Sequence, residues 1–300
     1  MALCETGAVV GSVSGGCIED DLIAQYSKAN AIIDSAPVQL KYGISADEAH
    51  RFGLPCGGTL RLVQEPVQDT AWIEEVLART QAHQLVARTV SLKDGAVQLR
   101  DAQRGEALQF DGLTLTTLFG PRWRLLLIGA GQLSQAVAQM ASMLDFEVLV
   151  CDPREEYAAT LQMSGVTRVM GMPDDVVTAL HPDAHTAVVA LTHDPKLDDL
   201  ALLEALNSDA FYVGALGSRR NQATRKVRLA EHFDLSDEAL ARLHGPVGLH
   251  LGAKTPAEIA ISIMAEIVQV KNHVVQNLGQ PVALRDLDMG DSRITACALG

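Results

Sequence analysis

A glycine turn followed at a distance by an acid is the pattern in this sequence that most clearly predicts ligand binding. Gly129 and Gly131 lie in the segment GAGQLS, and Asp152 follows about 20 residues later. In dinucleotide-binding folds such glycines let the backbone approach a pyrophosphate, and an acid at this spacing accepts hydrogen bonds from the adenosine ribose. Ser134 takes the place of a third glycine, which weakens the cofactor prediction more than the fold prediction. The turn therefore predicts a phosphate site, with a nucleotide or NAD(P) as one candidate ligand.

Two cysteines beside glycine pairs predict a different chemistry. A thiolate is a soft ligand, suited to metals and to sulfur chemistry. The start of the helix expected after Cys17 favours a thiolate, whereas the acids at 19–21 oppose it, so the residues alone favour a small buried packing cysteine. If the two loops meet in space, they form one small site with two thiols and many backbone amides. The residues of this candidate site are Gly15, Gly16, Cys17, Cys56, Gly57 and Gly58.

Further polar residues follow apolar runs in the second half of the chain. His193 comes after the run 186–191, and Ser218 and Arg219 open a basic helix. Ligands of parallel sheets bind at the carboxyl ends of strands, so we include these residues in the candidate site. The alternatives are a capping or packing role for His193 and a solvated charged face for the basic helix, and the residues alone favour both alternatives.

Lys254 and Thr255 lie between a glycine-rich segment and a long apolar helix. Thr255 is a good N-cap, with Pro256 at the first helical position and Glu258 behind it. This helix start faces another glycine loop, so Lys254 and Thr255 are candidate ligand-binding residues.

The elements that position these groups alternate as strands and helices, which predicts an α/β fold. Short apolar runs of this kind form strands that are buried on both faces, and helical spacing separates them. We expect a Rossmann-like, doubly wound parallel sheet over residues 118–275. The expected strands are 125–128, 147–151, 167–170, 186–191 and 211–215, and the expected helices begin near 132, 174, 197, 218 and 257.

The first part of the chain predicts a smaller α+β domain over residues 1–117. Its expected helices are 18–30 and 69–80, and its expected strands are 38–42, 59–63, 85–90 and 96–100. Residues 101–121 are only weakly periodic, and we place the domain boundary near 118. Residues 276–300 are expected to form a C-terminal tail.

Charge and composition exclude several classes of protein. The formal net charge is −13, from 24 basic and 37 acidic residues. Such a surface repels nucleic acids and anionic membranes. No apolar run is long enough to span a bilayer, and residues 1–11 show neither the basic region nor the continuous apolar segment expected of a signal peptide. The five cysteines are scattered and odd in number, which is typical of reduced thiols. We therefore expect a cytoplasmic protein.

Several motifs resemble those of one family. The segments GSVSGGCIEDDLI, FGLPCGGTL, LLIGAGQLS, VGALGSRR and GLHLGAKTPAEIAISIMAEI are similar to motifs of the XdhC/CoxI family of xanthine dehydrogenase accessory proteins. This resemblance covers nearly the whole chain. Family members usually carry a further segment before the SGGC loop, so we expect the first domain to lack its first segment.

The resemblance implies a maturation factor or chaperone rather than a stand-alone enzyme. Such a factor binds molybdenum cofactor (molybdopterin), assists its sulfuration with a cysteine desulfurase, and delivers it to a molybdenum hydroxylase such as xanthine dehydrogenase. Cys17 and Cys56 would then contact molybdenum or its sulfur. A homodimer is one of the expected oligomeric states. Two alternatives remain. One is an NAD(P)-dependent oxidoreductase using His193, and the other is a protein-docking factor whose nucleotide fold is vestigial.

Overall fold

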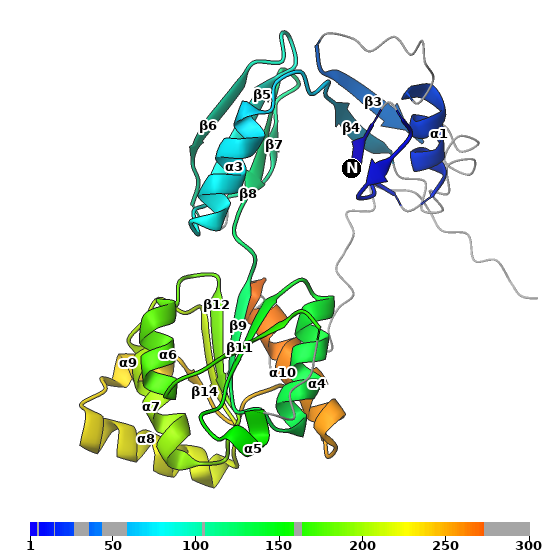
Figure 1. Cartoon of the computed structure of the whole chain (residues 1–300). Coiled ribbons are helices and arrows are strands. Elements are labelled where there is room, and N and C mark those ends of the chain that lie inside the picture. The colour runs from blue at the N-terminus through cyan, green and yellow to red at the C-terminus, as the bar shows by residue number, and fades with distance from the viewer. Residues whose placement is uncertain are drawn as a thin grey trace, which may run out of the picture. The chain divides into compact units, whose positions relative to one another are not determined.

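The computed structural model describes residues 1–4, 6–14, 16–26, 36–43, 59–103, 106–158 and 164–272. The chain divides into two compact units, residues 1–121 and 122–300 (Figure 1). The boundary predicted near 118 lies within β8, the last strand of the first unit.

The first unit begins with a small layer of short strands around one helix. Strand β1 pairs antiparallel with β2, and β3 pairs antiparallel with β4. Helix α1 buries Ile18 and Leu22 in a cluster with Tyr42 of β3. The bounds are β1 (Ala2–Leu3), β2 (Val9–Val10), α1 (Cys17–Tyr26), β3 (Val38–Tyr42) and β4 (Leu60–Gln64).

An antiparallel sheet in the order β6-β5-β8-β7 completes the first unit together with α3. Strands β7 and β8 lie in the segment whose sequence is only weakly periodic. Most side chains of β8 are half-buried, so the strand lacks the sharp alternation that predicts one buried face. The bounds are α3 (Ala71–Gln81), β5 (Val86–Ser91), β6 (Val97–Asp101), β7 (Gln109–Phe110) and β8 (Thr114–Phe119).

The second unit is built on a six-stranded parallel sheet in the order β11-β10-β9-β12-β13-β14. Counted along the unit this order is 3-2-1-4-5-6, the arrangement of dinucleotide-binding folds, and it reverses between β9 and β12. The predicted α/β fold class is confirmed. The bounds are β9 (Arg124–Ile128), β10 (Glu147–Cys151), β11 (Val166–Val169), β12 (Thr186–Ala190), β13 (Tyr212–Ala215) and β14 (Leu243–His244).

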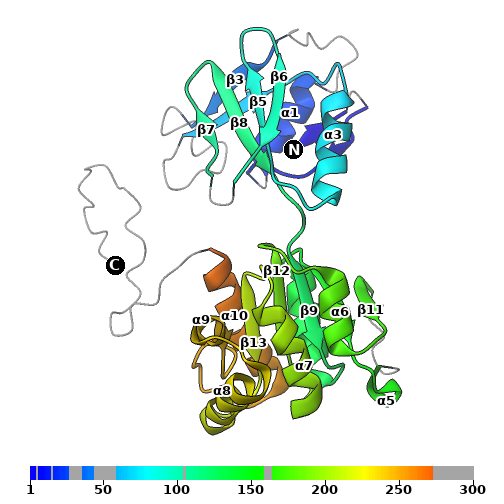
Figure 2. The same ribbon diagram turned by 90° about the vertical axis from the view of Figure 1, so that its left-hand side faces the viewer.

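Helices cover both faces of this sheet (Figures 1 and 2). Helices α4 and α10 pack on one face, and α6 to α9 pack on the other, each through its own apolar cluster. Strands β9 and β12 are buried along their whole length, as two-sided cover requires. The bounds are α4 (Gln132–Met143), α5 (Glu155–Ala158), α6 (Pro173–Leu180), α7 (Pro195–Leu206), α8 (Arg219–Phe233), α9 (Asp237–Ala241) and α10 (Pro256–Lys271).

A buried ion-pair network joins α7 and α8. The Arg225 Nη2 lies 3.1 Å from Asp198 Oδ2, and its Nε lies 3.1 Å from Asp199 Oδ1. Asp198 also accepts hydrogen bonds from the amide and hydroxyl of Thr192, which follows β12. The solvated charged face favoured from the sequence is therefore wrong at Arg225, which is 6% exposed.

We predict that Arg225→Met destabilises the second unit by about 3–5 kcal/mol, because the buried Asp198 then loses its charged partner and Asp199 keeps only Arg228. Urea unfolding followed by circular dichroism measures this change. Arg220→Met is the matched control, since Arg220 is exposed on the same helix. Equal stability of the two variants would contradict the structural role of Arg225.

Candidate functional site

The glycine turn after β9 lies where the order of the sheet reverses. The Gly129 amide donates a hydrogen bond of 2.7 Å to the carbonyl oxygen of Cys151, at the end of β10. Gly129 has a φ of 107°, and a Cβ there would lie 3.1 Å from the Thr192 backbone nitrogen. Only glycine fits this position, which sits against the tips of both neighbouring strands.

Helix α4 begins directly after the turn and leaves its first amides without side-chain acceptors. Within the described residues, no side chain accepts a hydrogen bond from the amides of residues 131–134. Gly131 has extended backbone angles, and a Cβ at this position would meet nothing within 4 Å. The first turn of α4 also contains no acidic residue. The start of α4 therefore combines open space with the partial positive charge that attracts a phosphate.

The loop before α1 has its amides occupied by the chain itself. The Glu19 carboxylate accepts hydrogen bonds from the amides of Val13, Ser14 and Gly16 at 2.7, 2.7 and 2.9 Å. Glu19 therefore fills an anion-binding concavity. These loop contacts go beyond the stabilisation that an acid ordinarily gives to the first turn of a helix.

The starts of α8 and α10 are also capped from within. Glu258 accepts from the amides of Lys254 and Thr255 at 2.8 and 3.0 Å, and the Thr255 hydroxyl accepts from the Glu258 amide. At α8 the Ser218 side chain accepts from the Asn221 amide at 3.2 Å. Among the candidate sites in the described part of the chain, the start of α4 therefore offers the least obstructed amides to an external anion.

Asp152 lies at the tip of β10, where the sequence predicts it, but it is already bonded on both oxygens. Its Oδ2 accepts from the Ala130 amide at 2.9 Å, and Arg154 donates to both oxygens. The carboxylate is 0% exposed. Burial raises the pKa of Asp152, but the hydrogen bonds from Arg154 and the Ala130 amide outweigh burial and lower it overall. Asp152 holds the turn in place through these contacts.

The remaining candidates of this unit are exposed at loops that follow strands. His193 follows β12 and has a φ of 63°. Arg219 begins α8 beyond β13, and Lys254 lies in the loop before α10. Because all six strands are parallel, the residues that follow β9, β10, β12 and β13 all lie at the edge of the sheet formed by the carboxyl ends of its strands. The structure thus brings Gly129, Gly131, Asp152, His193, Ser218 and Arg219 to the same edge.

Cys17 is exposed at the first residue of α1. The buried packing role favoured from the residues is therefore wrong. Gly15, Cys56, Gly57 and Gly58 lie outside the described residues, so the meeting of the two cysteine loops stays a prediction. Within the described part of the chain, no group of three or more His, Cys, Asp or Glu residues is placed to hold a metal ion.

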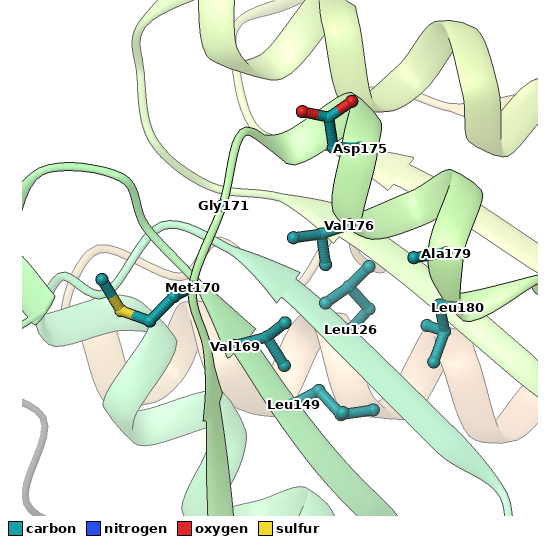
Figure 3. Close-up of a pocket in the computed structure, with 9 residues that line it drawn as sticks. All are labelled: Leu126, Leu149, Val169, Met170, Gly171, Asp175, Val176, Ala179 and Leu180. Atoms are coloured by element: carbon teal, nitrogen blue, oxygen red, sulfur yellow. The ribbon is translucent and has the colours of Figure 1, made fainter.

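An apolar hollow of about 370 Å³ lies beside α6 (Figure 3). Its single ionisable lining residue is an acid, Asp175, so it does not suit a phosphate. None of the predicted site residues lines it. The lining consists of Leu126, Leu149, Val169, Met170, Gly171, Asp175, Val176, Ala179 and Leu180.

Comparison with known proteins identifies the second unit. Residues 125–267 match the family model described as the XdhC Rossmann domain. The second unit is an XdhC Rossmann domain. A crystal structure of a xanthine dehydrogenase from Bacillus halodurans has a TM-score of 0.70 and 25% identity, covering 91% of this chain and 86% of that one. The resemblance to the XdhC/CoxI family is confirmed.

Curated relatives are similar over different lengths. A probable xanthine dehydrogenase subunit of Bacillus subtilis (strain 168) is 26% identical, over 91% of this chain and 88% of that protein. Molybdenum cofactor insertion chaperone PaoD of Escherichia coli (strain K12) is 25% identical, over 91% and 78%. The uncharacterized protein YqeB of the same strain is 36% identical, but the match covers 52% of this chain and only 29% of that protein.

The described part of the XdhC domain contains no helix that is long and apolar enough to cross a membrane, and the same holds for the described part of the first unit.

A half-buried acid that the sequence motifs did not reveal, Glu266, holds the loop before α10 in the XdhC domain. Glu266 accepts from the Tyr212 hydroxyl and from the Gly248 amide, both at 2.6 Å. Its other oxygen lies 3.1 Å from His244 Nδ1. The sequence did contain a signal for Glu266, because it is an acid among the apolar residues of a helix. A carboxylate in such a place needs hydrogen-bond partners to offset its burial. Glu266 thereby fixes the start of the segment that leads to Lys254.

We predict that Glu266 stabilises the XdhC domain in a pH-dependent way. Burial raises the pKa of Glu266, but hydrogen bonds from His244, Tyr212 and the Gly248 amide lower it overall. A pKa lower in the folded than in the unfolded state stabilises the fold above the ordinary glutamate pKa of about 4.3. That contribution is lost as the pH falls through the lower folded value.

Glu266→Gln should therefore lower the free energy of unfolding by about 2 kcal/mol near neutral pH, and the deficit should shrink below about pH 4.3. Chemical unfolding across pH measures this, with Glu238→Gln on the exposed face of α9 as control. A deficit that does not change with pH would contradict the assignment.

Proposed function

We propose that this chain binds molybdenum cofactor, assists its sulfuration, and delivers it to a molybdenum hydroxylase such as xanthine dehydrogenase. The proposal is supported by the XdhC Rossmann domain and by relatives named as a molybdenum cofactor insertion chaperone and a probable xanthine dehydrogenase subunit. A cysteine desulfurase is the proposed source of sulfur, and the cytoplasm the proposed compartment.

The observation that carries the proposal is the start of α4. Its amides at residues 131–134 have no side-chain acceptor in the described residues, and the space above Gly131 is open. Molybdenum cofactor ends in a phosphate or diphosphate, which fits a helix start of this kind. We assign the phosphate end of the ligand to the turn at Gly129 to Gly131, and His193, Ser218 and Arg219 to the same edge.

Cys17 is the described residue whose chemistry fits the metal end of the cofactor. The residue is exposed at the start of α1, next to the loop that Glu19 holds through three amides. A thiolate is a soft ligand for molybdenum or its sulfur. We propose that Cys17, together with Cys56, contacts molybdenum or its sulfur. In the second unit, Lys254 and Thr255 are proposed to contribute to ligand binding.

The oxidoreductase alternative has weaker support from the geometry. A ribose at Asp152 would have to displace Arg154, which donates to both carboxylate oxygens. His193 is exposed, and in the described residues no side chain is bonded to it as an acid or base partner would be. These observations favour a carrier of a phosphorylated ligand over a nicotinamide-dependent catalyst.

We predict that Gly131→Trp abolishes binding of molybdenum cofactor while the protein stays folded. The backbone angles of Gly131 suit any residue, and the indole would fill the open space at the start of α4. Titration of isolated molybdenum cofactor, followed by ligand fluorescence after oxidation, measures retention. Gln139→Trp is the matched control, because Gln139 is exposed near the other end of α4. Unchanged affinity in folded Gly131→Trp would move the phosphate site elsewhere.

We predict that Cys17→Ser and Cys56→Ser stay folded but lose most activation of a partner hydroxylase. Serine keeps the size of the side chain and removes the soft ligand. Activity of the hydroxylase after incubation with each loaded variant is the measurement. Cys4→Ser serves as control because Cys4 is also exposed in the first unit. A double variant as active as the parent would leave these two cysteines without a role in sulfuration.

A further inference from the structure

The guanidinium of Arg154 has a fixed plane next to the glycine turn. Its Nε donates to Asp152 Oδ1 and its Nη2 donates to Asp152 Oδ2, both at 2.9 Å. Two parallel hydrogen bonds between an arginine and a carboxylate define the orientation of the guanidinium plane as well as its position. Because the same Asp152 accepts from the Ala130 amide, a single carboxylate links this plane to the turn.

The Tyr157 ring covers one face of the Arg154 guanidinium, while part of the Arg154 side chain stays accessible. The Arg154 Cζ lies 4.2 Å from the centroid of the Tyr157 ring, so the ring backs one face. The Arg154 side chain is nevertheless 26% exposed. Because Asp152 takes the Nε and Nη2 edge and Tyr157 lies against the guanidinium, the side left for a ligand is the face turned away from Tyr157.

The surroundings of Arg154 suit stacking better than recognition of a second anion. Its charge is balanced by Asp152, and Asp194 is close enough to add further negative potential. A guanidinium in such a place offers a planar, weakly hydrated surface more than a net positive charge. Guanidinium planes stack well on flat heterocycles, and the strength of stacking depends little on the identity of the heterocycle.

We propose that the exposed face of Arg154 stacks against the planar heterocycle of a ligand whose phosphates lie at the start of α4. The ligand class is a phosphorylated pterin or nucleotide. This inference rests on the proposed function and gives Asp152 a different role from the ribose acceptor predicted from the sequence. Asp152 orients the stacking plane and the turn together.

The test separates the ring from the phosphates. Calorimetric titration of the full chain with ADP, with neopterin triphosphate and with ribose 5-diphosphate, which lacks a base, is repeated on Arg154→Lys. Lysine keeps the charge and removes the plane. We expect Arg154→Lys to weaken binding of ADP and neopterin triphosphate about tenfold and to leave ribose 5-diphosphate unchanged. If only one of the two ring ligands shows this loss, that ligand identifies the ring class. Arg220→Lys on α8 is the matched control and should change none of the affinities.

Other outcomes overturn the proposal. Equal weakening of all three ligands would mean that Arg154 acts through the turn, and no weakening of any would mean that its plane is not used. Tyr157→Leu gives a second reading, because loss of the backing ring should weaken the same ring ligands and spare ribose 5-diphosphate. If the wild-type chain binds ribose 5-diphosphate as tightly as ADP and neopterin triphosphate, the stacking inference fails, but the phosphate site at α4 stands. If it binds none of the three, the phosphate site at α4 fails with it.

Discussion

The hydrogen bond between the Ala130 amide and Asp152 is the contact on which the candidate site depends. It spans 2.9 Å inside the unit and ties the turn after β9 to the tip of β10. The same carboxylate holds Arg154, while Gly129 packs against the backbone after β12. One buried acid therefore fixes the start of α4 and its neighbouring surface relative to the sheet. Its lowered pKa shows that these partners outweigh the cost of burial.

Acidic side chains elsewhere in the chain satisfy amides that would otherwise attract anions. Glu19 fills the loop before α1, Glu258 caps α10, and Glu266 holds the amide of Gly248. Each contact stabilises a glycine-containing loop from within and removes a competing phosphate site. In a chain with a net charge of −13, this arrangement leaves the start of α4 as the proposed place for an external anion.

The sequence predicted the parts of the fold that repeat a simple physical pattern. Fully buried strands such as β9 and β12 are apolar runs in the sequence, and Gly129 was predicted to form a turn. The close packing of Gly129 against Thr192 was found only in the structure. Partners far apart in sequence were not predictable. The burial of Arg225 depends on acids in another helix. The pairing of Asp152 with Arg154 is local, but it depends on the side-chain conformation of Arg154, which the spacing does not determine. Strand β8 was missed because its half-buried side chains blur the alternation.

The most direct test of the proposed function is the identity of the small molecule that the protein carries. The full chain is purified from cells that make molybdenum cofactor, the ligand is released by denaturation, and its mass and metal content are determined. We expect a phosphorylated pterin together with molybdenum, near one per chain. Recovery of NAD(P), or of a protein that carries neither pterin nor molybdenum under these conditions, would contradict the proposed function.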